Sequence, residues 1–368
     1  MDRIKKNFGF GFMRLPMIGD EVDYEHTIKM VDAFLAAGFN YFDTAHGYID
    51  GKSEIALNRC LTSRYPRESY VLTNKLSPGH FEKQEDIRPL FMEQLRICGV
   101  EYFDFYLMHA QNKDLFAKYK SCRAYETALE LKAEGKICHV GLSFHDKASV
   151  LEKILTEYPE IEVVQIQFNY LDYFDPAIEG KECYEVCRKF NKPIIIMEPV
   201  KGGSLVNLPQ EAQKILDDLN GGSNASYALR YCAGFEGVIM TLSGMGNMDM
   251  MTDNIATMKD FKPLCKKEQE ALKTVRDIVV KQSLIPCTAC KYCVDGCPQK
   301  IAIPDLFSCY NDYKTFKSWN VEYLYSVHTK TGGKAADCIS CGQCEAACPQ
   351  HLEIPKLLKK VADVFDKK

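Results

Sequence analysis

The chain has no excess of positive charge and no long apolar segment. Its 368 residues include 46 Lys and Arg against 50 Asp and Glu, with an isoelectric point near 6.1. Nucleic-acid-binding domains usually show a basic patch and a high isoelectric point, so we expect no nucleic-acid partner. No apolar run is long enough to cross a bilayer. The start, MDRIKKNFGFGF, lacks the apolar region and cleavage site of a signal peptide. We therefore expect a cytoplasmic protein with no membrane partner.

The chain also lacks a disulfide framework, although it contains 17 cysteines. Eight of them form two copies of one pattern near the C-terminus. The other nine are scattered: Cys60, Cys98, Cys122, Cys138, Cys183, Cys187, Cys232, Cys265 and Cys309. Scattered thiols of this kind are typical of a reducing compartment. The remaining composition is that of a globular protein, and the length allows two domains.

The repeated cysteine pattern reads C-x2-C-x2-C-x3-C-P. Its copies are Cys287, Cys290, Cys293 and Cys297, then Cys338, Cys341, Cys344 and Cys348. Three cysteines at this spacing bind one iron–sulfur cube, and in two-cluster ferredoxins the fourth ligates the other cluster. The spacing thus predicts two [4Fe–4S] clusters, one on Cys287, Cys290, Cys293 and Cys348, the other on Cys338, Cys341, Cys344 and Cys297. Structural zinc favours two separated CxxC pairs and disulfides favour short secreted chains, so both explain the tandem repeat less well.

Up to about residue 260, short β-rich apolar runs alternate with longer amphipathic segments. Eight runs, each followed by a helix, predict a (β/α)8 TIM barrel. Gly38, Gly99 and Gly135 stand where helix ends favour a left-handed residue. An open doubly wound sheet is the alternative, but Gly9-Phe10-Gly11 is not followed by the third glycine of its phosphate turn. The predicted strands are Phe8–Leu15, Phe39–Asp43, Tyr70–Asn74, Asp104–His109, Ile137–Ser143, Val163–Phe168, Pro193–Glu198 and Gly237–Ser243.

The predicted domains follow one another along the chain. The barrel occupies 1–262, a linker helix 263–285, and a small, mostly helical ferredoxin-like domain 286–368. Between the cysteine motifs, the insert Gln299–Asp337 has helical character over Asp305–Trp319, and the tail Leu352–Phe365 reads as an amphipathic helix.

Four polar residues stand at or just beyond the ends of three predicted strands: Asp43, Tyr48, Lys75 and His109. In a parallel barrel, strand C-termini and the loops after them form the active-site face, so the four should converge there. A lysine ammonium favours the ionised form of a neighbouring phenol, and an aspartate keeps the lysine charged. Histidine can polarise a carbonyl oxygen. Together they suit protonation of the alkoxide that forms when a hydride attacks an aldehyde or ketone, although each residue alone has an ordinary structural explanation.

With this tetrad in place, the barrel resembles the aldo/keto reductase family. The likeness continues through HVGLSFHD (139–146), VVQIQFNY (163–170), MEPVKGGSL (197–205) and SGMGNMDMMTDN (243–254). It implies a nicotinamide dinucleotide bound without a Rossmann fold. Ser143 and Gln165 would contact its carboxamide, and Met197 stands where many members stack a tyrosine. The pyrophosphate would lie on Pro199, Val200, Lys201, Gly202 and Gly203, and the adenosine end on Gly244, Met245, Gly246, Asp253 and Asn254.

The chain departs from the family at Phe144, where many members have asparagine, and near Met250, where a basic residue often binds the 2′-phosphate. We expect NADP(H), with Lys201 the nearest basic residue, while NAD(H) or FMN stay open. The whole chain resembles a subgroup with two C-terminal clusters. It would be an oxidoreductase acting on a small carbonyl or alcohol substrate. An electron-transfer protein serving a redox partner, or clusters with a purely structural role, are the alternatives.

Overall fold

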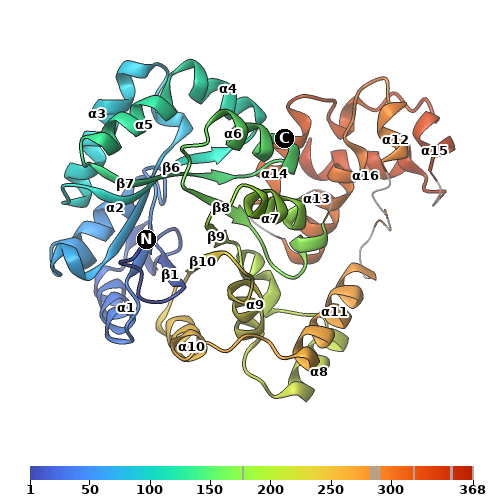
Figure 1. Ribbon diagram of the computed structural model, residues 1–368. Helices are drawn as coiled ribbons and strands as arrows, with labels where there is room; N and C mark the ends of the chain where they lie inside the picture. The colour runs from blue at the N-terminus through green and yellow to red at the C-terminus, as the bar shows by residue number, and fades with distance from the viewer. Residues whose placement is uncertain are drawn as a thin grey trace. The chain divides into compact units, whose positions relative to one another are not determined.

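The computed structural model describes residues 1–175, 178–281, 285, 287, 291–317, 320–348 and 351–366 (Figure 1). Its main sheet is a closed parallel barrel in the order β1-β10-β9-β8-β7-β6-β5-β4, in which β1 also pairs with β4. Each predicted strand overlaps one barrel strand, so the predicted fold class is confirmed. The strands are β1 (Phe8–Gly11), β4 (Tyr41–Asp43), β5 (Val71–Leu76), β6 (Phe103–Gln111), β7 (Ile137–Phe144), β8 (Val163–Gln167), β9 (Ile194–Met197) and β10 (Val238–Gly244).

Helices follow the barrel strands, and two short elements were not predicted. The hairpin of β2 (Met17–Ile18) and β3 (Glu21–Val22) is one of them. The other is α4 (Lys113–Ser121), which follows β6. No described helix is both long and apolar enough to cross a membrane. The other helices up to residue 259 are α1 (Tyr24–Ala36), α2 (Lys52–Leu57), α3 (Gln84–Cys98), α5 (Ala124–Ala133), α6 (Ala148–Glu157), α7 (Gly180–Lys189), α8 (Gln210–Leu219), α9 (Asn224–Ala233) and α10 (Met248–Lys259).

Large side chains fill the barrel interior, and a strand glycine makes room for them. The buried cluster inside contains Tyr41, Phe105, Leu107 and Met240, among others. A Cβ at Gly9 would lie 2.7 Å from Leu242 Cδ2 and 2.9 Å from Tyr41 Cδ1. Gly9 is therefore a packing residue of β1, which agrees with the rejection of a phosphate turn at this position.

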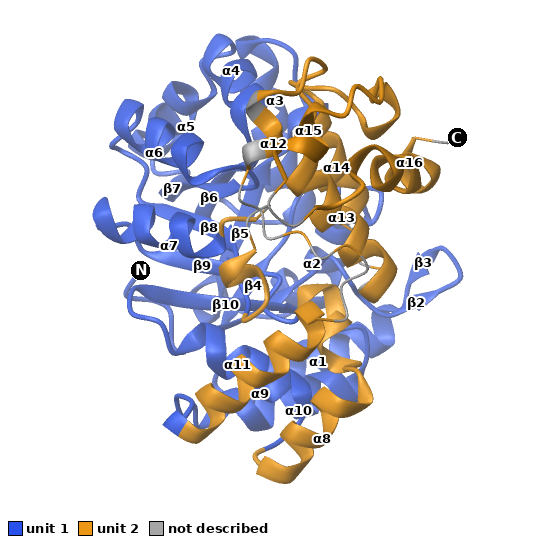
Figure 2. Cartoon of the chain, turned by 90° about the vertical axis from the view of Figure 1, so that its right-hand side faces the viewer, with its two compact units in different colours: residues 1–169, 180–200, 222–266 blue, residues 170–179, 201–221, 267–368 orange. Residues whose placement is uncertain are grey.

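By packing, the chain divides into two compact units that do not follow the predicted linear boundaries (Figure 2). Unit 1 consists of 1–169, 180–200 and 222–266 and contains the barrel strands. Unit 2 consists of 170–179, 201–221 and 267–368. The segments that follow β8 and β9 in sequence thus belong to the same unit as the C-terminal cysteine motifs.

Unit 2 contains two copies of one backbone arrangement. In each copy a residue with left-handed backbone, Lys291 (φ 64°) or Gly342 (φ 77°), precedes a four-residue helix that holds the third cysteine. A longer helix with proline in its first turn follows. Over the described residues, these two longer helices confirm the helical character predicted for Asp305–Trp319 and for Leu352–Phe365. In the C-terminal part of unit 2 the helices are α11 (Lys266–Lys281, whose first residue belongs to unit 1), α12 (Tyr292–Asp295), α13 (Ile303–Phe316), α14 (Val321–Thr329), α15 (Gln343–Ala346) and α16 (Ile354–Phe365).

Apolar residues from α13, α14 and α16 form one core in unit 2. Leu306 and Phe307 of α13, Val321 of α14, and Leu358 and Val361 of α16 are fully or almost fully buried in it. Of the motif cysteines, Cys293, Cys344 and Cys348 are buried in this same core, while Cys287, Cys297 and Cys338 pack against it. The core therefore brings the two motifs together.

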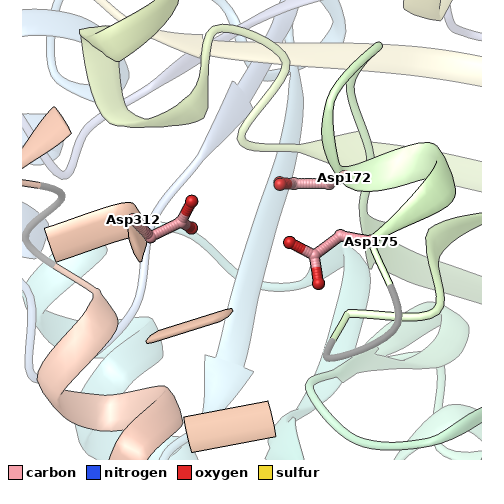
Figure 3. A group of neighbouring side chains, drawn as sticks. All are labelled: Asp172, Asp175 and Asp312. Atoms are coloured by element: carbon pink, nitrogen blue, oxygen red, sulfur yellow. The ribbon is translucent and has the colours of Figure 1, made fainter. Parts of the chain in front are cut away.

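A buried lysine joins three segments of unit 2. Lys201 Nζ lies 2.5 Å from Asp172 Oδ1 and 2.6 Å from Asp312 Oδ2. Asp175 completes the group and accepts from Ser308 Oγ, 2.9 and 3.1 Å away. Figure 3 shows the three carboxylates facing one another, two from the segment after β8 and one from α13. Lys201 is only 3% exposed, so its ammonium is the cation of this acidic group.

The charge balance of this group predicts a pH-dependent stability. Burial and the charges of Asp175 and Asp172 raise the pKa of Asp312 from 3.8 to about 7, against the opposing effect of Lys201. Between about pH 4 and 7 the folded chain therefore holds a proton that the unfolded chain releases, and stability falls as pH rises through this window. Asp312→Asn should remove this dependence.

Calorimetric unfolding of the full chain at pH 5, 6, 7 and 8 measures the effect. We expect the wild type to lose more than about 1.4 kcal/mol across the window, which corresponds to one pKa unit, and Asp312→Asn to lose less. Lys201→Met is the companion variant. It should destabilise the chain at pH 8, because it leaves buried carboxylates without their cation. Parallel pH profiles for wild type and Asp312→Asn would contradict this account.

Candidate active site

The four residues predicted to form the catalytic group lie at adjoining strand ends of unit 1. Asp43 is the last residue of β4, Lys75 the next-to-last residue of β5, and His109 lies near the end of β6. These three strands are parallel neighbours in the barrel. Tyr48 follows in the loop between β4 and α2. Because parallel strands end at the same end of a barrel, all four residues lie at one end of it.

Lys75 connects the group. Its Nζ lies 2.6 Å from Asp43 Oδ1 and donates to Thr44 O at 2.8 Å. The same ammonium lies 4.8 Å from the centre of the Tyr48 ring. The Tyr48 ring meets the His109 ring edge to face, with centroids 5.7 Å apart. Asp43 and Lys75 are buried, whereas Tyr48 and His109 are partly exposed and accessible to a substrate.

A tightly folded loop holds Tyr48. Tyr48 N donates to Ala45 O at 3.0 Å, and Tyr48 O accepts from Gly51 N and Ser53 N, both at 3.2 Å. Ile49, Asp50 and Gly51 follow with positive φ angles of 52°, 53° and 84°. Only glycine adopts this backbone without strain, so two non-glycine residues in a row here mark a constrained segment.

The charges of the group set its protonation states. Burial lowers the pKa of Lys75, but the interactions with Asp43 and with Tyr48 together outweigh burial, raise that pKa and keep the lysine protonated. Burial raises the pKa of Tyr48, while the Lys75 charge acts in the opposite direction and is the weaker effect. The Lys75 charge thus acts on the Tyr48 pKa in the direction expected from the sequence, and burial outweighs it. The Tyr48 phenol holds its proton firmly at neutral pH.

His109 is a neutral imidazole. Burial, together with the charge of Lys75 and those of His145 and His80, lowers its pKa well below the ordinary value. Its Nδ1 lies 2.9 Å from Ser77 Oγ. If the serine hydroxyl donates to Nδ1, Nε2 carries the hydrogen and can donate to a carbonyl oxygen. Sequence reasoning missed Ser77, because a hydroxyl two residues beyond Lys75 carries no spacing signal.

The residues predicted to contact the carboxamide lie next to this group. Ser143 Oγ accepts from Ala110 N at 2.8 Å, so it adjoins the end of β6. Gln165 is 3% exposed, and its Nε2 lies 3.5 Å from Met197 Sδ. Gln165 Oε1 is buried without a hydrogen-bond partner among the described atoms. Such an acceptor costs free energy unless a donor arrives, and the amide of a carboxamide is a donor that fits it.

The residues predicted to hold the adenosine end surround the start of α10. Asn247 caps this helix, its side chain accepting from Met250 N at 2.9 Å. Asp253 Oδ2 accepts from Ser223 Oγ, and Asn254 Nδ2 donates to Ser243 Oγ. Gly244, Met245 and Gly246 form the turn before the helix. Arg14 borders this turn, since a Cβ at Gly244 would lie 3.4 Å from Arg14 Cβ.

Arg14 was not among the predicted site residues. Its Nη2 lies 3.5 Å from Glu198 Oε1, and the side chain is 36% exposed. An arginine whose side chain passes a glycine turn before a helix suits an anionic ligand. An isolated arginine after the first strand gave no signal in the sequence.

The predicted pyrophosphate segment crosses the boundary between the units. Pro199 and Val200 belong to unit 1, while Lys201, Gly202 and Gly203 belong to unit 2. Lys201, proposed from the sequence as the basic residue for a 2′-phosphate, has its ammonium between Asp172 and Asp312. Gly202 and Gly203 have positive φ angles of 66° and 97°, which glycine adopts freely.

The two cysteine motifs lie close together in unit 2. Helices α12 and α15, which carry Cys293 and Cys344, pack against each other. Burial raises the pKa of the Cys344 thiol, and both Cys338 and Cys297 add to this effect. Cys297 of the first motif therefore lies close to the second motif. Cys341 is exposed, and Cys290 lies outside the described residues.

Comparison with known proteins gives two family matches. Residues 7–277 match the Aldo/keto reductase family, and residues 286–353 match the 4Fe-4S dicluster domain. Among solved structures, an aldo-keto reductase from Klebsiella pneumoniae in complex with NADPH is similar with a TM-score of 0.61 at 19% identity, over 73% of this chain and 90% of that one. The glycerol dehydrogenase AKR11B4 from Gluconobacter oxydans has a TM-score of 0.59 at 19% identity, over 76% and 94%.

Among curated proteins, the NADH-specific methylglyoxal reductase of Escherichia coli is 29% identical over 48% of this chain and 57% of that protein. Aldo-keto reductase str7 of Strobilurus tenacellus is 26% identical over 54% and 59%. The chain thus spans less than two thirds of these curated relatives. Because the family match covers most of the chain and the barrel agrees with it, the chain belongs to the aldo/keto reductase family of oxidoreductases.

Proposed function

We propose that the chain reduces an aldehyde or ketone, or oxidises the corresponding alcohol, with a nicotinamide dinucleotide and with Tyr48 as general acid. The buried Lys75 between Asp43 and the Tyr48 ring is the observation that carries the proposal. A charged lysine at 0% exposure costs free energy unless it is paired. The ion pair of Lys75 with Asp43 lies next to the Tyr48 ring, whose phenol is protonated. A neutral His109 completes the group.

Each residue has a separate task in the proposed reaction. His109 donates a hydrogen bond to the carbonyl oxygen and orients it. A reduced nicotinamide supplies the hydride when it is bound. Tyr48 gives its proton to the developing alkoxide, and Lys75 stabilises the tyrosinate that results. Asp43 keeps Lys75 charged and in place.

The nucleotide that we propose is NADP(H). Two of the similar solved structures, both from Klebsiella pneumoniae, contain NADPH or NADP. The aliphatic carbons of Arg14 lie beside Gly244 and its guanidinium lies near Glu198, whereas Lys201 is engaged by two carboxylates. The first turn of α10 carries Asp249, which repels a 2′-phosphate. Arg14 is therefore the residue on which the preference for NADP(H) depends.

We further propose that unit 2 holds two [4Fe–4S] clusters with crossed ligands, and that they exchange electrons with a redox partner. Thiolates are the ligands that such clusters require. The interaction of Cys344 with Cys297 of the other motif supports the crossed assignment. The exposed Cys341 and Ile339 leave the second motif accessible to a partner.

Replacement of Tyr48 by phenylalanine tests the general acid. Tyr48→Phe should lower kcat for carbonyl reduction by ~10²–10⁴, the usual contribution of a general acid. Nucleotide binding should change little, because the hydroxyl acts on the reacting oxygen. Tyr65→Phe is the control, since that phenol bonds to Asp32 at the surface. An unchanged kcat in Tyr48→Phe would reject Tyr48 as the acid.

Replacement of Gln165 by leucine tests the nucleotide. If Oε1 accepts from the carboxamide, Gln165→Leu should weaken NADPH binding by about tenfold, which corresponds to about 1.4 kcal/mol. ADP-ribose, which lacks the nicotinamide, should bind wild type and variant equally. Equal losses for both ligands would mean a general disturbance of the barrel.

The same titrations compare NADPH with NADH in wild type and Arg14→Met. We expect wild type to bind NADPH more tightly and the variant to lose that preference. Equal affinities in the wild type would mean that no residue contacts a 2′-phosphate and that NAD(H) is the cofactor.

Iron analysis of paired cysteine variants tests the crossed ligands. Anaerobically purified wild type should contain about eight irons per chain. A double change of Cys297 and Cys341 to serine removes two ligands of one predicted cluster and should leave about four irons. A double change of Cys297 and Cys293 removes one ligand from each and should lower both. Cys265→Ser is the control, since Cys265 is exposed and outside the motifs. If instead the Cys297 and Cys341 variant lost iron from both clusters and the Cys297 and Cys293 variant kept about four irons, each motif would ligate its own cluster.

A further inference from the structure

The backbone of Lys75 lies beyond the strand pairing that holds Asp43. The ladder between β4 and β5 ends with Asp43 opposite Thr73, and Thr44 N donates to Thr73 O at 2.9 Å. Lys75 follows two residues later in a strand that is buried throughout, and it is paired with β6 on the other side. Buried backbone groups need hydrogen-bond partners, so beyond the end of this ladder groups other than β4 must serve Lys75.

Two buried amide side chains take that role. Asn74 Oδ1 accepts from Lys75 N at 2.8 Å, and Gln94 Nε2 of α3 donates to Lys75 O at 3.1 Å. The hydroxyl of Tyr106 in β6 donates to Gln94 Oε1 at 2.6 Å, which leaves the nitrogen end of this amide facing Lys75. Side chains therefore hold both the N–H and the C=O of the proposed catalytic lysine.

Glu54 of α2 holds both amides. Its Oε1 accepts from Asn74 Nδ2 at 2.7 Å and from Gln94 Nε2 at 3.0 Å, and its Oε2 lies 2.7 Å from His46 Nδ1. Glu54 is 0% exposed, and a carboxylate buried this deeply needs donors and a compensating charge. The hydrogen bond to Glu54 raises the pKa of His46 against the opposing effect of burial, so the imidazole can carry that charge.

Ser53, the residue before Glu54, contacts the other side of the catalytic group. Ser53 N donates to Tyr48 O at 3.2 Å, and Ser53 Oγ lies 2.7 Å from Thr44 Oγ1. Thr44 O in turn accepts from the ammonium of Lys75 at 2.8 Å. Two consecutive residues at the start of α2 are thus bonded to the loop that carries Tyr48 and, through the two amides, to the backbone of Lys75.

We propose that Ser53 and Glu54 form a positioning unit that sets the separation between the Lys75 ammonium and the Tyr48 ring. The inference rests on the proposed function. Ser53 fixes the loop of Tyr48, and Glu54 fixes the two amides that hold the Lys75 backbone. The ammonium lies 4.8 Å from the ring centre. This separation determines how strongly Lys75 stabilises the tyrosinate formed in the proposed reaction, because the attraction between charges weakens with distance.

A purely structural role for Glu54 is the alternative. A satisfied buried polar network makes a fold rigid wherever it lies. The hydrogen bonds of Glu54 nevertheless lead to both backbone groups of one residue, and that residue is the lysine beside Tyr48. A hydrogen bond nearby provides the contrast. Thr62 Oγ1 donates to Cys98 O at the end of α3, and that contact does not lead to a residue of the catalytic group.

Replacement of Gln94 by methionine removes the donor to Lys75 O and keeps a similar volume. We expect kcat for aldehyde reduction to fall by about tenfold or more, because a small displacement of a catalytic group is costly. The KM for the aldehyde and the Kd of NADPH should change little, since neither ligand contacts the network. Thr62→Val is the matched control. It removes one hydrogen bond at the end of the same helix and should leave kcat unchanged.

Two substitutions of Glu54 separate hydrogen bonding from a general disturbance of the fold. Glu54→Gln keeps an oxygen for the two amides, and its NH2 group can donate to a neutral His46, so kcat should stay near that of the wild type. Glu54→Leu removes the acceptor and should reproduce the loss of Gln94→Met, again without a change in KM. If Glu54→Leu does not fold, the comparison of Gln94→Met with Glu54→Gln still decides.

A double-variant cycle shows whether Gln94 acts through Lys75. In the Lys75→Met background, Gln94→Met should lower kcat no further, because the group that it positions is absent. Equal losses in both backgrounds would overturn the inference, and so would an unchanged kcat in Gln94→Met or a change confined to KM. Full activity in Tyr48→Phe would instead overturn the proposed function, and the inference with it. When Tyr48→Phe is inactive, the other outcomes concern the positioning unit alone.

Discussion

The buried ion pair between Lys75 and Asp43 is the interaction on which the site at the strand ends depends. An ammonium and a carboxylate removed from water are costly, and only their mutual attraction and further hydrogen bonds offset that cost. Asp43 at the end of β4 and Lys75 near the end of β5 are therefore bound to each other by the parallel register of the two strands. This fixes a positive charge under the Tyr48 ring. The phenol then responds to two opposed effects, burial and that charge, and burial is the stronger.

Unit 2 contains a second buried lysine with a different charge balance. Lys75 faces one carboxylate, whereas Lys201 lies among Asp172, Asp175 and Asp312. More carboxylates than ammonium groups make one of the acids hold its proton near neutrality, and the raised pKa of Asp312 is that effect. The segments after β8 and β9 supply two of these acids and the lysine. A sequence segment that the family resemblance assigns to pyrophosphate thus carries a residue committed to the core of the cysteine-containing unit.

Much of the fold and the four catalytic candidates could be predicted from the sequence, because both follow from local pattern. Apolar runs of strand length predict the barrel strands, and polar residues at the ends of these runs predict the site. Helix α4 was missed because its sequence is largely polar, although Asn112 caps it by accepting from two backbone N–H groups. The ion pairs of Lys201 with Asp172 and Asp312 depend on long-range packing that no spacing encodes. The lowering effect of Lys75 on the Tyr48 pKa could be predicted, but the larger opposing effect of burial could not, since the extent of burial is a property of the folded chain.

The proposed chemistry of the two units differs in the number of electrons moved at once. A nicotinamide transfers two electrons as a hydride, whereas a [4Fe–4S] cluster normally accepts one at a time, and nicotinamide radicals are too unstable to connect the two easily. Direct exchange between the barrel and the clusters therefore needs a flavin or a flavoprotein to split the pair. The site that we propose around Tyr48 combines a protonated phenol with a neutral His109. In the proposed reaction a proton accompanies each hydride, and on that proposal the barrel and the clusters act on separate partners.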